Sequence, residues 1–254
     1  MLAIIPAAGK GKRLRPLTNI APKPLLPVYN KPMIFYPLLS LKEAGIKEVI
    51  IVVDKSNKSY FKDFFKDGKK FGFKIHYVIQ KEQKGIAHAI ASTKKLAKNK
   101  KIVIIHADNI FEDNLKEALS NFKKQSFRIN KQKVSGAKII LKQVSDPARF
   151  GVVEFKNNNI VSVKEKPKKP KSNWITAGFY MFDERVFDII DKLKPSIRGE
   201  YEISDLVNFY IKEGSITYEK IKNAWFDVGT IESLHEASDF IARNKRLREW
   251  KLEC

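Results

Sequence analysis

Several kinds of residue that build common sites are scarce in this chain of 254 residues. Its one cysteine, Cys254, excludes an intrachain disulfide and a cysteine-built metal site, and it favours a reducing compartment. The histidines His76, His88 and His235 show no metal-ligand spacing among themselves. No apolar run reaches the roughly 20 residues of a membrane span, and the apolar stretch near the N-terminus is too short for a signal peptide. We therefore expect a cytoplasmic protein that does not use a membrane.

Negative charge is also scarce, because 28 Asp and Glu stand against 49 Lys and Arg, for a net charge of +21. Such an excess attracts polyanions, but a solvated lysine-rich surface produces it equally well. The lysines are spread along the chain, and no zinc-finger, homeodomain or aromatic RNA-binding signature accompanies them. We therefore expect no specific nucleic-acid partner. A hydrophobic content of 43% is typical of a globular protein.

Short β-branched or aromatic runs alternate with periodic segments in the first two-thirds of the chain. The runs that predict strands are 2–6, 49–53, 73–79 and 102–105. The segments that predict helices are 32–44, with Asn30 as a candidate N-cap, and then 56–65 and 86–97. This alternation is typical of an α/β fold with a mainly parallel sheet covered by helices. Binding sites in such folds lie at the carboxyl ends of the strands.

From about residue 134 strands dominate the pattern. We predict strands at 134–144, 151–155, 160–163 and 174–182, with a hairpin turn at 157–159. Helices are expected again at 184–192, at 204–213 and from Thr230 onward, where Thr230 is a candidate cap. Neither an internal repeat nor a linker rich in Gly, Pro or Ser is present. We therefore predict a single domain over 1–254, with lobes of about 1–133 and 134–228 and a C-terminal helix of about 230–254.

The segment after the first predicted strand combines small residues with cations. Gly9 and Gly11 let backbone N–H groups approach an anion closely, and Lys12, Arg13 and Arg15 add positive charge beside them. A phosphate suits this combination, although glycines also occur in ordinary turns. On its own, the loop is therefore either a phosphate site or a plain turn.

Two later segments present a charged residue near a predicted strand or loop. Lys23 lies among three prolines, which either aim it at the glycine loop or belong to an irregular connection. Asp108 follows the strand at 102–105, where a carboxylate suits Mg²⁺ bound together with substrate phosphates. The alternative is that Asp108 caps a helix beginning near Glu112.

Two further segments carry carboxylates in distinctive surroundings. Asp227 follows Trp225 and Phe226, so it is a candidate partly buried carboxylate that needs a cation or donors, or that hydrogen-bonds to its own glycine turn. Glu165 and Lys166 end a predicted strand. They could bind sugar hydroxyls and a phosphate, or form a solvated strand end.

Taken together, these segments resemble the sugar-1-phosphate nucleotidyltransferase family. The resemblance runs from about Ile4 to Ile241, and its motifs occur in the family's order. They are 7–14 (AAGKGKRL), 22–28 (PKPLLPV), 31–37 (KPMIFYP), 108–111 (DNIF), 146–153 (DPARFGVV), 165–167 (EKP), 198–200 (RGE) and 225–230 (WFDVGT). One such motif is weak evidence, whereas eight in order favour phosphate binding by the glycine loop.

The resemblance implies a Rossmann-like, mostly parallel mixed sheet flanked by helices, of the nucleotide-diphospho-sugar transferase type. It implies a nucleotide-binding lobe followed by a strand-rich, sugar-phosphate-binding lobe. The implied reaction transfers a nucleotidyl group from a nucleoside triphosphate to a sugar 1-phosphate and releases pyrophosphate, with Mg²⁺ as the cofactor. The motifs are most similar to those of the branch that uses dTTP and glucose 1-phosphate.

The resemblance also implies roles for individual residues of this chain. Arg13 and Lys23 would stabilise the pyrophosphate, and Lys166 would position the attacking phosphate. The implied metal ligands are Asp108 and Asp227. The implied nucleotide-binding residues are Ala8, Gly9, Gly11, Lys12, Arg13, Gln80, Gly85 and Asp108, with Gln80 and Gly85 reading the base. The implied sugar-phosphate-binding residues are Gly151, Glu165, Lys166, Thr176, Tyr180 and Arg198.

Some features depart from the family pattern and leave alternatives open. Ala107 and Lys12 stand where the family usually has glycine and threonine or serine, respectively. The segment 4–9 (IIPAAG) is also similar to the uridylyltransferase branch, so UTP or another triphosphate is an alternative to dTTP. The chain ends soon after its last predicted helix, so we expect the regulatory nucleotide site of many bacterial relatives to be absent or altered. A homodimer is compatible with the resemblance. The alternative outside enzymes is a regulatory subunit with the same fold.

Overall fold

The computed structural model describes residues 1–250, so Cys254 and the end of the predicted C-terminal helix lie outside the described residues. The described chain forms two compact units built from interleaved segments. The first unit contains 1–83, 105–116 and the chain from Asn223 onward, and the second contains 84–104 and 117–222. The single-domain organisation stays a prediction.

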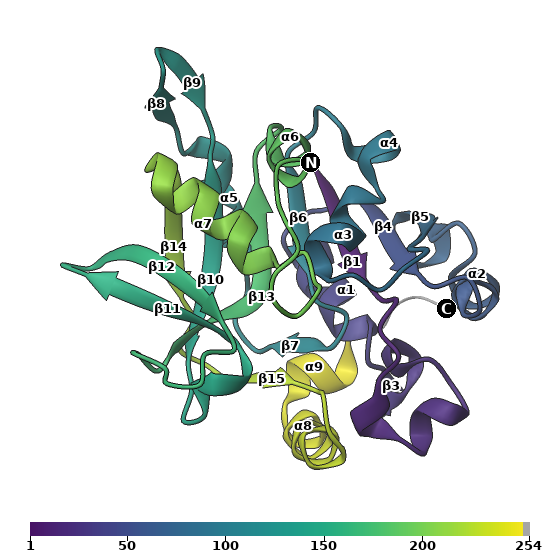
Figure 1. Ribbon diagram of the computed structural model, residues 1–254. Coiled ribbons are helices and arrows are strands. Elements are labelled where there is room, and N and C mark those ends of the chain that lie inside the picture. Colours follow the sequence, from purple (N-terminus) through teal and green to yellow (C-terminus); the bar gives the residue numbers. More distant parts are fainter. Residues whose placement is uncertain (251–254) are drawn as a thin grey trace. The chain divides into compact units, whose positions relative to one another are not determined.

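The first unit is an α/β structure around three parallel strands, in which β4 pairs with β1 on one side and with β5 on the other (Figure 1). Its strands are β1 (Leu2–Pro6), β2 (Pro27–Val28), β3 (Lys31–Pro32), β4 (Glu48–Val53), β5 (Lys74–Ile79), β7 (Asn109–Phe111) and β15 (Trp225–Asp227). Its α-helices are α1 (Phe35–Glu43), α2 (Lys58–Phe65), α8 (Ile231–Arg243) and α9 (Lys245–Glu249). Short 3₁₀ turns lie at η1 (Lys12–Leu14), η2 (Leu17–Asn19), η3 (Lys23–Leu25) and η4 (Lys69–Phe71).

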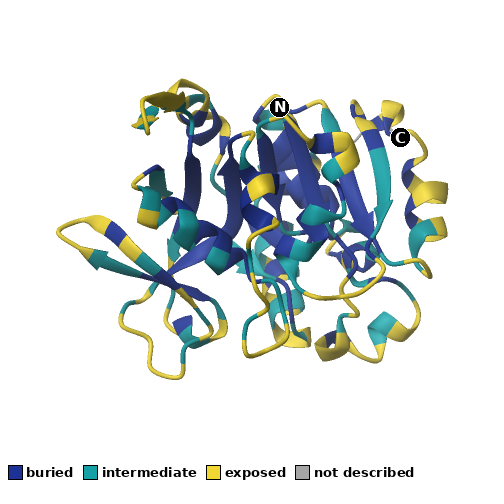
Figure 2. Ribbon diagram, turned by 45° about the horizontal axis from the view of Figure 1, so that its top comes forward, coloured by how far each residue is buried: buried dark blue, intermediate teal, exposed yellow. Residues whose placement is uncertain are grey.

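The parallel strands form because their residues are apolar on both faces. Ile4 and Ile5 of β1 and Ile50 and Ile51 of β4 have no exposed surface. Figure 2 shows these strands as buried along almost their whole length. Parallel strands that are covered on both faces have such unbroken apolar sequences. Because the strands run in one direction, the glycine loop after β1 and the loops after β4 and β5 begin at the same edge of the sheet.

A second apolar cluster of the first unit packs α1 against α8 and α9. Tyr36 of α1, Ile241 of α8 and Leu247 of α9 are all buried in it. Arg246 of α9 adds polar contacts, because Nη1 donates to both carboxylate oxygens of Glu43 at 2.7 and 2.6 Å. The C-terminal helices are therefore part of the first unit's core.

The second unit is rich in strands. Strand β13 pairs antiparallel with β10 and β11, β11 pairs antiparallel with β12, and β10 pairs in parallel with β14. Its strands are β6 (Ile102–Ile105), β8 (Phe127–Ile129), β9 (Gln132–Val134), β10 (Ala137–Gln143), β11 (Gly151–Lys156), β12 (Asn159–Glu165), β13 (Trp174–Phe182) and β14 (Ile216–Lys220). Its helices are α3 (Ile86–Ala91), α4 (Lys94–Ala97), α5 (Lys116–Lys124), α6 (Val186–Ile190) and α7 (Ile203–Glu213), with a 3₁₀ turn η5 (Pro147–Arg149). The predicted α/β class and the strands expected after residue 134 are confirmed.

Of three local predictions about turns and helix caps, two are confirmed and one is wrong. Asn157 and Asn158 have φ of 49° and 61°, as a two-residue hairpin turn requires, and they join β11 to β12. The side chain of Thr230 accepts from Ser233 N at 3.2 Å and caps α8, as predicted. Asn30 is wrong as the N-cap of the first helix, because it lies in the hairpin between β2 and β3 and α1 begins only at Phe35.

The helix predicted over 86–97 is wrong as one continuous helix, because it divides into α3 and α4. At the break, Ser92 Oγ donates to the carbonyl of Ala89 at 2.6 Å and Thr93 Oγ1 donates to that of Ile90 at 2.7 Å. Hydroxyl groups that bond to backbone carbonyls in this way compete with a continuing helix.

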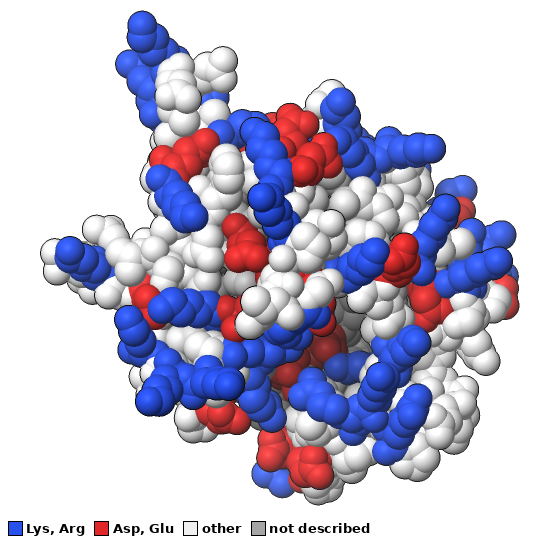
Figure 3. Space-filling model, in the orientation of Figure 1, with Lys and Arg blue, Asp and Glu red and all other residues white. Residues whose placement is uncertain are grey.

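Lysine and arginine side chains are distributed over the surface, with carboxylates among them, as the face in Figure 3 shows. No helix in the part of the chain that the structure describes has the length and apolar character needed to cross a bilayer.

Candidate active site

The glycine loop after β1 presents backbone donors that no protein group uses. In the described part of the chain, the N–H groups of Gly9, Lys10 and Gly11 donate to no protein acceptor. A Cβ at Gly9 would meet nothing within 4 Å, whereas at Gly11, where φ is 57°, it would lie 2.8 Å from Thr18 Cγ2 and 2.9 Å from Lys23 Cβ. The loop is therefore open at Gly9 and closely packed at Gly11. Such a row of N–H groups is suited to a phosphate.

Strands β7 and β15 bring together two carboxylates that are far apart in the sequence. Their antiparallel register places Asp227 opposite Asn109, and Val228 N donates to the carbonyl of Asp108 at 2.9 Å. The Asn109 amide nitrogen Nδ2 lies 3.1 Å from Asp227 Oδ1 and 3.4 Å from Asp108 Oδ1. One buried amide therefore contacts both predicted metal ligands.

Two cations complete this group of side chains. Lys23 Nζ forms an ion pair and a hydrogen bond with Asp108 Oδ2, and only 11% of the Lys23 side chain is exposed. A Cβ at Gly229 would lie 2.7 Å from Arg13 Nη2 and 3.4 Å from Asp227 Oδ2, so the Arg13 guanidinium occupies the space that a side chain there would need. We call Arg13, Lys23, Asp108 and Asp227 the carboxylate cluster.

The two carboxylates of the cluster have opposite pKa shifts. Burial raises the pKa of Asp108, but the charge and hydrogen bond of Lys23, with the charge of His106, bring it below its ordinary value. Burial and the charge of Asp108 raise the pKa of Asp227 to about 6, against the opposing effects of Lys23 and Arg13. Since the two carboxylates repel each other, a cation bound by both would relieve that repulsion.

The donor set fits a divalent cation that is shared with a substrate. Among the described residues there is no group of three or more His, Cys, Asp or Glu side chains that could hold a metal. A metal at the carboxylate cluster would thus have two carboxylate ligands from the protein, Asp108 and Asp227. Mg²⁺ binds in this way, because it takes one or two carboxylates and completes its octahedral shell with water and substrate phosphates.

The structure also brings together four of the predicted sugar-phosphate-binding residues, all in the second unit. Gly151 of β11 lies opposite Glu165 of β12. A Cβ at Gly151 would lie 2.9 Å from Thr176 Oγ1 and 3.4 Å from Glu165 Oε2, and the Tyr180 hydroxyl donates to Thr176 Oγ1 at 2.9 Å. The missing side chain at Gly151 thus lets the carboxylate of Glu165 and the hydroxyl of Thr176 lie close to the backbone of β11. Carboxylates and hydroxyls are groups that bind sugar hydroxyls.

Arg198 has carboxylates on several sides. Its Nη1 lies 3.7 Å from Glu165 Oε1 and 3.2 Å from Glu202 Oε1, and its Nη2 lies 3.2 Å from Glu200 Oε1. Burial and the charge of Glu202 raise the pKa of Glu165, although Lys166 and Arg198 oppose this effect. A phosphate bound by Arg198 would have to share the guanidinium with these carboxylates.

Lys166 has a strained backbone. Its φ is 43°, in the left-handed region, and its N–H donates to the carbonyl of Phe150 at 2.9 Å. A non-glycine residue in that region costs of order 1–3 kcal/mol and persists only where its surroundings fix it, often at a functional position. The left-handed conformation and this hydrogen bond fix the backbone of Lys166 directly after Glu165.

The predicted base-reading residues have defined backbone positions. Gln80 follows β5 in the first unit, is only 6% exposed and donates from its N–H to the carbonyl of Val53 at 2.8 Å. Gly85 lies in the second unit with φ of 94°, where a Cβ would be 2.5 Å from the carbonyl oxygen of Tyr201. Of the other predicted nucleotide-binding residues, Lys12 is exposed, and Ala8 accepts at its carbonyl from Gln83 Nε2 at 2.5 Å.

Sequence reasoning missed three residues of the first unit that shape the site. Asn109 and Gly229 lie inside two of the motifs, so the motifs carried a signal for them, whereas Gln83 had none. The alternative that Asp108 caps a helix near Glu112 is wrong, because the strand β7 follows Asp108 and α5 begins only at Lys116.

Comparison of the sequence with known protein families gives one match that spans nearly the whole chain. The model of the nucleotidyl transferase family matches residues 2–244. The chain belongs to that family. A glucose-1-phosphate thymidylyltransferase of Neisseria meningitidis is 39% identical over 257 residues, which cover 100% of this chain and 87% of that protein. A nucleotidyltransferase activity follows from the family and confirms the predicted enzyme class.

Two solved structures are similar to the nucleotidyltransferase described here. One is a candidate glucose-1-phosphate thymidylyltransferase from Bacillus anthracis in complex with sucrose, with a TM-score of 0.88, 36% identity and coverage of 99% of this chain and 97% of that chain. The other is a UDP-glucose pyrophosphorylase in complex with UDP-glucose, with a TM-score of 0.82, 27% identity and coverage of 95% and 98%. The predicted fold type is confirmed.

Proposed function

We propose that the chain transfers a thymidylyl group from dTTP to glucose 1-phosphate and releases pyrophosphate, with dTDP-glucose as the other product. The observation that carries the chemistry is the carboxylate cluster, in which two carboxylates and two cations lie together and could hold a metal–phosphate complex. The substrates are inferred from the similarity of the whole chain to glucose-1-phosphate thymidylyltransferases.

The proposed reaction is a direct displacement at phosphorus. A phosphate oxygen of the sugar 1-phosphate attacks the α-phosphorus of the triphosphate and forms the new P–O bond. The bond from the α-phosphorus to the oxygen that bridges to the β-phosphate breaks, and its electron pair stays on the pyrophosphate. The reaction needs no protein nucleophile, so the protein acts by positioning two anions and stabilising their charge.

The first unit supplies the nucleotide side of this reaction. The free N–H groups of Gly9, Lys10 and Gly11 would hold phosphate oxygens. Arg13 and Lys23 would stabilise the negative charge that develops on the pyrophosphate. Asp108 and Asp227 would hold Mg²⁺, which when bound supplies Lewis-acid polarisation of the phosphoryl oxygens.

The second unit supplies the sugar-phosphate side. Glu165, Thr176 and Tyr180 would hydrogen-bond to sugar hydroxyls beside Gly151. Lys166 would bind and orient the attacking phosphate, and Arg198 would share its guanidinium between that phosphate and its carboxylate neighbours. We also expect a homodimer, which light scattering during gel filtration would test.

A second candidate donor is UTP. The similarity to a UDP-glucose pyrophosphorylase in complex with UDP-glucose favours it, although the identity is lower, at 27%. The Gln80 side chain and a backbone group at Gly85 could pair with thymine or uracil alike, because the two bases share their pairing edge.

A substrate panel tests the proposal. Each of dTTP, UTP, CTP and GTP is combined with glucose 1-phosphate and with other sugar 1-phosphates in the presence of Mg²⁺, and pyrophosphate release is measured. We expect the highest kcat/KM for dTTP with glucose 1-phosphate. A higher kcat/KM for UTP would show that UTP, and not dTTP, is the preferred donor. No pyrophosphate release with any pair would support the alternative that the protein is non-catalytic.

A further inference from the structure

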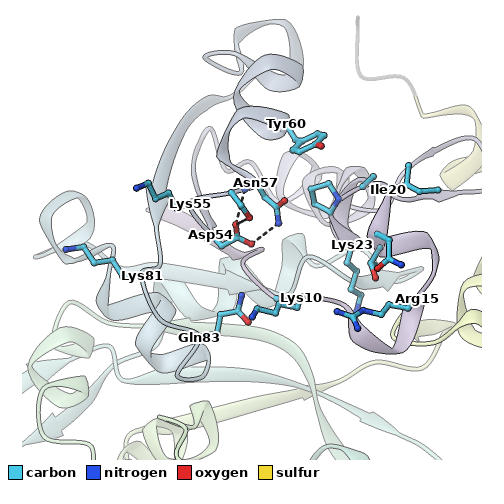
Figure 4. Close-up of a pocket in the computed structure, with 16 residues that line it drawn as sticks. Lys10, Arg15, Ile20, Lys23, Asp54, Lys55, Asn57, Tyr60, Lys81 and Gln83 are labelled. Carbon is cyan, nitrogen blue, oxygen red and sulfur yellow. Dashed lines mark hydrogen bonds between the residues drawn. The ribbon is translucent and has the colours of Figure 1, made fainter.

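The first unit contains a cavity of about 620 Å³ with a strongly basic lining. It lies among the glycine loop, the segment from Arg15 to Lys23 and the loops after β4 and β5 (Figure 4). Its volume is within the range of about 300–1,000 Å³ that is usual for small-molecule sites. The basic residues that line it are Lys10, Arg15, Lys23, Lys55 and Lys81, and the one acid among its described lining residues is Asp54.

The charge of this cavity is not balanced by the protein. Asp54 is engaged in its own turn, because Oδ1 accepts from Ser56 Oγ at 2.6 Å and from Asn57 N at 2.9 Å, and Oδ2 accepts from Asn57 Nδ2 at 2.7 Å. In the described part of the chain, none of Lys10, Arg15, Lys55 and Lys81 forms an ion pair. These like charges repel one another, and a bound anion would relieve that repulsion.

Lys23 connects this cavity to the carboxylate cluster, because it lines the cavity and also pairs with Asp108. In Figure 4, Lys23 and Arg15 stand on one wall, and Lys10 lies near Gln83. Lys55 and Lys81 stand across the cavity with their side chains directed outward. The cationic side chains therefore extend from the carboxylate cluster, past Arg15 and Lys10, to Lys55 and Lys81, which we call the rim.

We propose that Arg15 and Lys10 form a second phosphate site, which receives pyrophosphate after it has separated from the α-phosphorus. This inference rests on the proposed function, because that reaction produces pyrophosphate beside Lys23. Pyrophosphate is the most densely charged species released, and an arginine guanidinium binds phosphate oxygens through two parallel N–H bonds. Lys55 and Lys81 raise the local concentration of the anion at the rim and guide its exchange with solvent.

The role of such a site is to separate product release from nucleotide binding. An anion that leaves the cluster for Arg15 no longer competes with the next triphosphate for Lys23. Product release limits the turnover of many enzymes, so a second site along the exit path would raise kcat.

Titration calorimetry with sodium pyrophosphate and Mg²⁺, without sugar or nucleotide, tests the inference. The variants are Arg15→Gln and, as a matched control, Lys62→Gln, which removes an exposed lysine of α2 that does not line the cavity. We expect Arg15→Gln to weaken pyrophosphate binding at least tenfold, as the loss of a charged hydrogen bond does, and Lys62→Gln to leave it unchanged. Unchanged binding in Arg15→Gln would overturn the inference.

A second readout separates the exit site from a contact to the triphosphate itself. In Arg15→Gln we expect KM for dTTP to rise by less than threefold, while the inhibition constant of pyrophosphate rises at least tenfold. Equal increases in both would mean that Arg15 holds the triphosphate tail, and would overturn the inference. Thermal unfolding by circular dichroism checks that both variants are folded.

The rim has its own test. The double variant Lys55→Gln and Lys81→Gln is expected to slow pyrophosphate association at low salt and to make it less salt-dependent, while an unchanged salt dependence would contradict the rim's role. A wild-type protein that forms no nucleotide sugar with any substrate pair would contradict the proposed function. Pyrophosphate binding is measured without turnover, so the two failures are distinguishable.

Discussion

The side-chain amide of Asn109 donates to Asp227, with 3.1 Å between Nδ2 and Oδ1, and the same nitrogen lies 3.4 Å from Asp108 Oδ1. The register between β7 and β15 fixes this contact, since Asn109 and Asp227 are direct partners. One amide thus orients two carboxylates that reach the site from distant parts of the sequence. Because Asn109 is only 1% exposed, it has little freedom to orient them otherwise.

Replacing Asn109 by alanine should therefore disturb the carboxylates without unfolding the protein. We expect kcat to fall at least tenfold, because Asp227 loses the donor that orients it, and the free energy of unfolding to fall by about 1–3 kcal/mol. Steady-state kinetics and urea denaturation measure the two effects. The control Asn121→Ala removes an amide–carboxylate bond to Glu219 in the second unit and should leave kcat unchanged. An unchanged kcat in Asn109→Ala would contradict the positioning role.

Gly229 leaves the space that Arg13 occupies, so adding one methyl group there should displace the guanidinium. A Cβ at that position would lie 2.7 Å from Arg13 Nη2. We expect Gly229→Ala to lower kcat/KM for the triphosphate at least tenfold. The effect should almost disappear when Arg13 is already glutamine, because mutations that act through one contact are not additive. Additive losses in the double variant would show that Gly229 acts in some other way.

The capping box of α8 gives a stability prediction that is separate from catalysis. Thr230 accepts from Ser233 N, and the Ser233 side chain accepts from the backbone of Thr230. Thr230→Ala should lower the free energy of unfolding by about 1 kcal/mol, whereas Thr230→Ser keeps the accepting oxygen and should lower it by less. Urea midpoints with an unchanged slope would measure this difference. Equal midpoints for the two variants would contradict a capping role.

The raised pKa of Glu165 leads us to expect that the stability of the protein depends on pH. Burial and Glu202 raise its pKa in the folded protein, so the folded state binds this proton more tightly than the unfolded state does. The stability that it contributes is present below the ordinary value of 4.5 and is lost as pH rises through the raised pKa. The free energy of unfolding should therefore fall more steeply above pH 4.5 in the wild type than in Glu165→Gln.

Urea denaturation at a series of pH values measures that difference between the wild type and Glu165→Gln. Glu236→Gln, which changes an exposed carboxylate of α8, is the matched control and should follow the wild type. If the wild type and Glu165→Gln have parallel pH profiles, the carboxylate has the same proton affinity in both states and the account of its surroundings is wrong.

The sequence predicted the main strands because their apolar runs are continuous. β13 and β6 were predicted with their observed bounds, since each is flanked by polar residues on both sides. Helix starts were harder to predict, because tertiary contacts decide them. Asn30 has the side chain of an N-cap, but the β2–β3 hairpin uses it in a turn.

The site was predicted from its motifs, and the structure adds how its members contact one another. That Asp108 and Asp227 are close could be expected from the resemblance, but not that Asn109 joins them, because the contact depends on the β7–β15 register. In the same way, no pattern could show that Lys23 pairs with Asp108 or that Arg198 lies among three carboxylates. Such contacts depend on side chains that meet only after folding.

The most direct test of the central claim is the rate at which dTTP and glucose 1-phosphate give dTDP-glucose and pyrophosphate with Mg²⁺, in the wild type and in Asp108→Asn and Asp227→Asn. The account predicts equal amounts of the two products from the wild type. It predicts a rate about 10²–10³ lower in each variant, with the fold intact, because each loses a preorganised charge of the carboxylate cluster. Near-normal pyrophosphate release by both variants would contradict it.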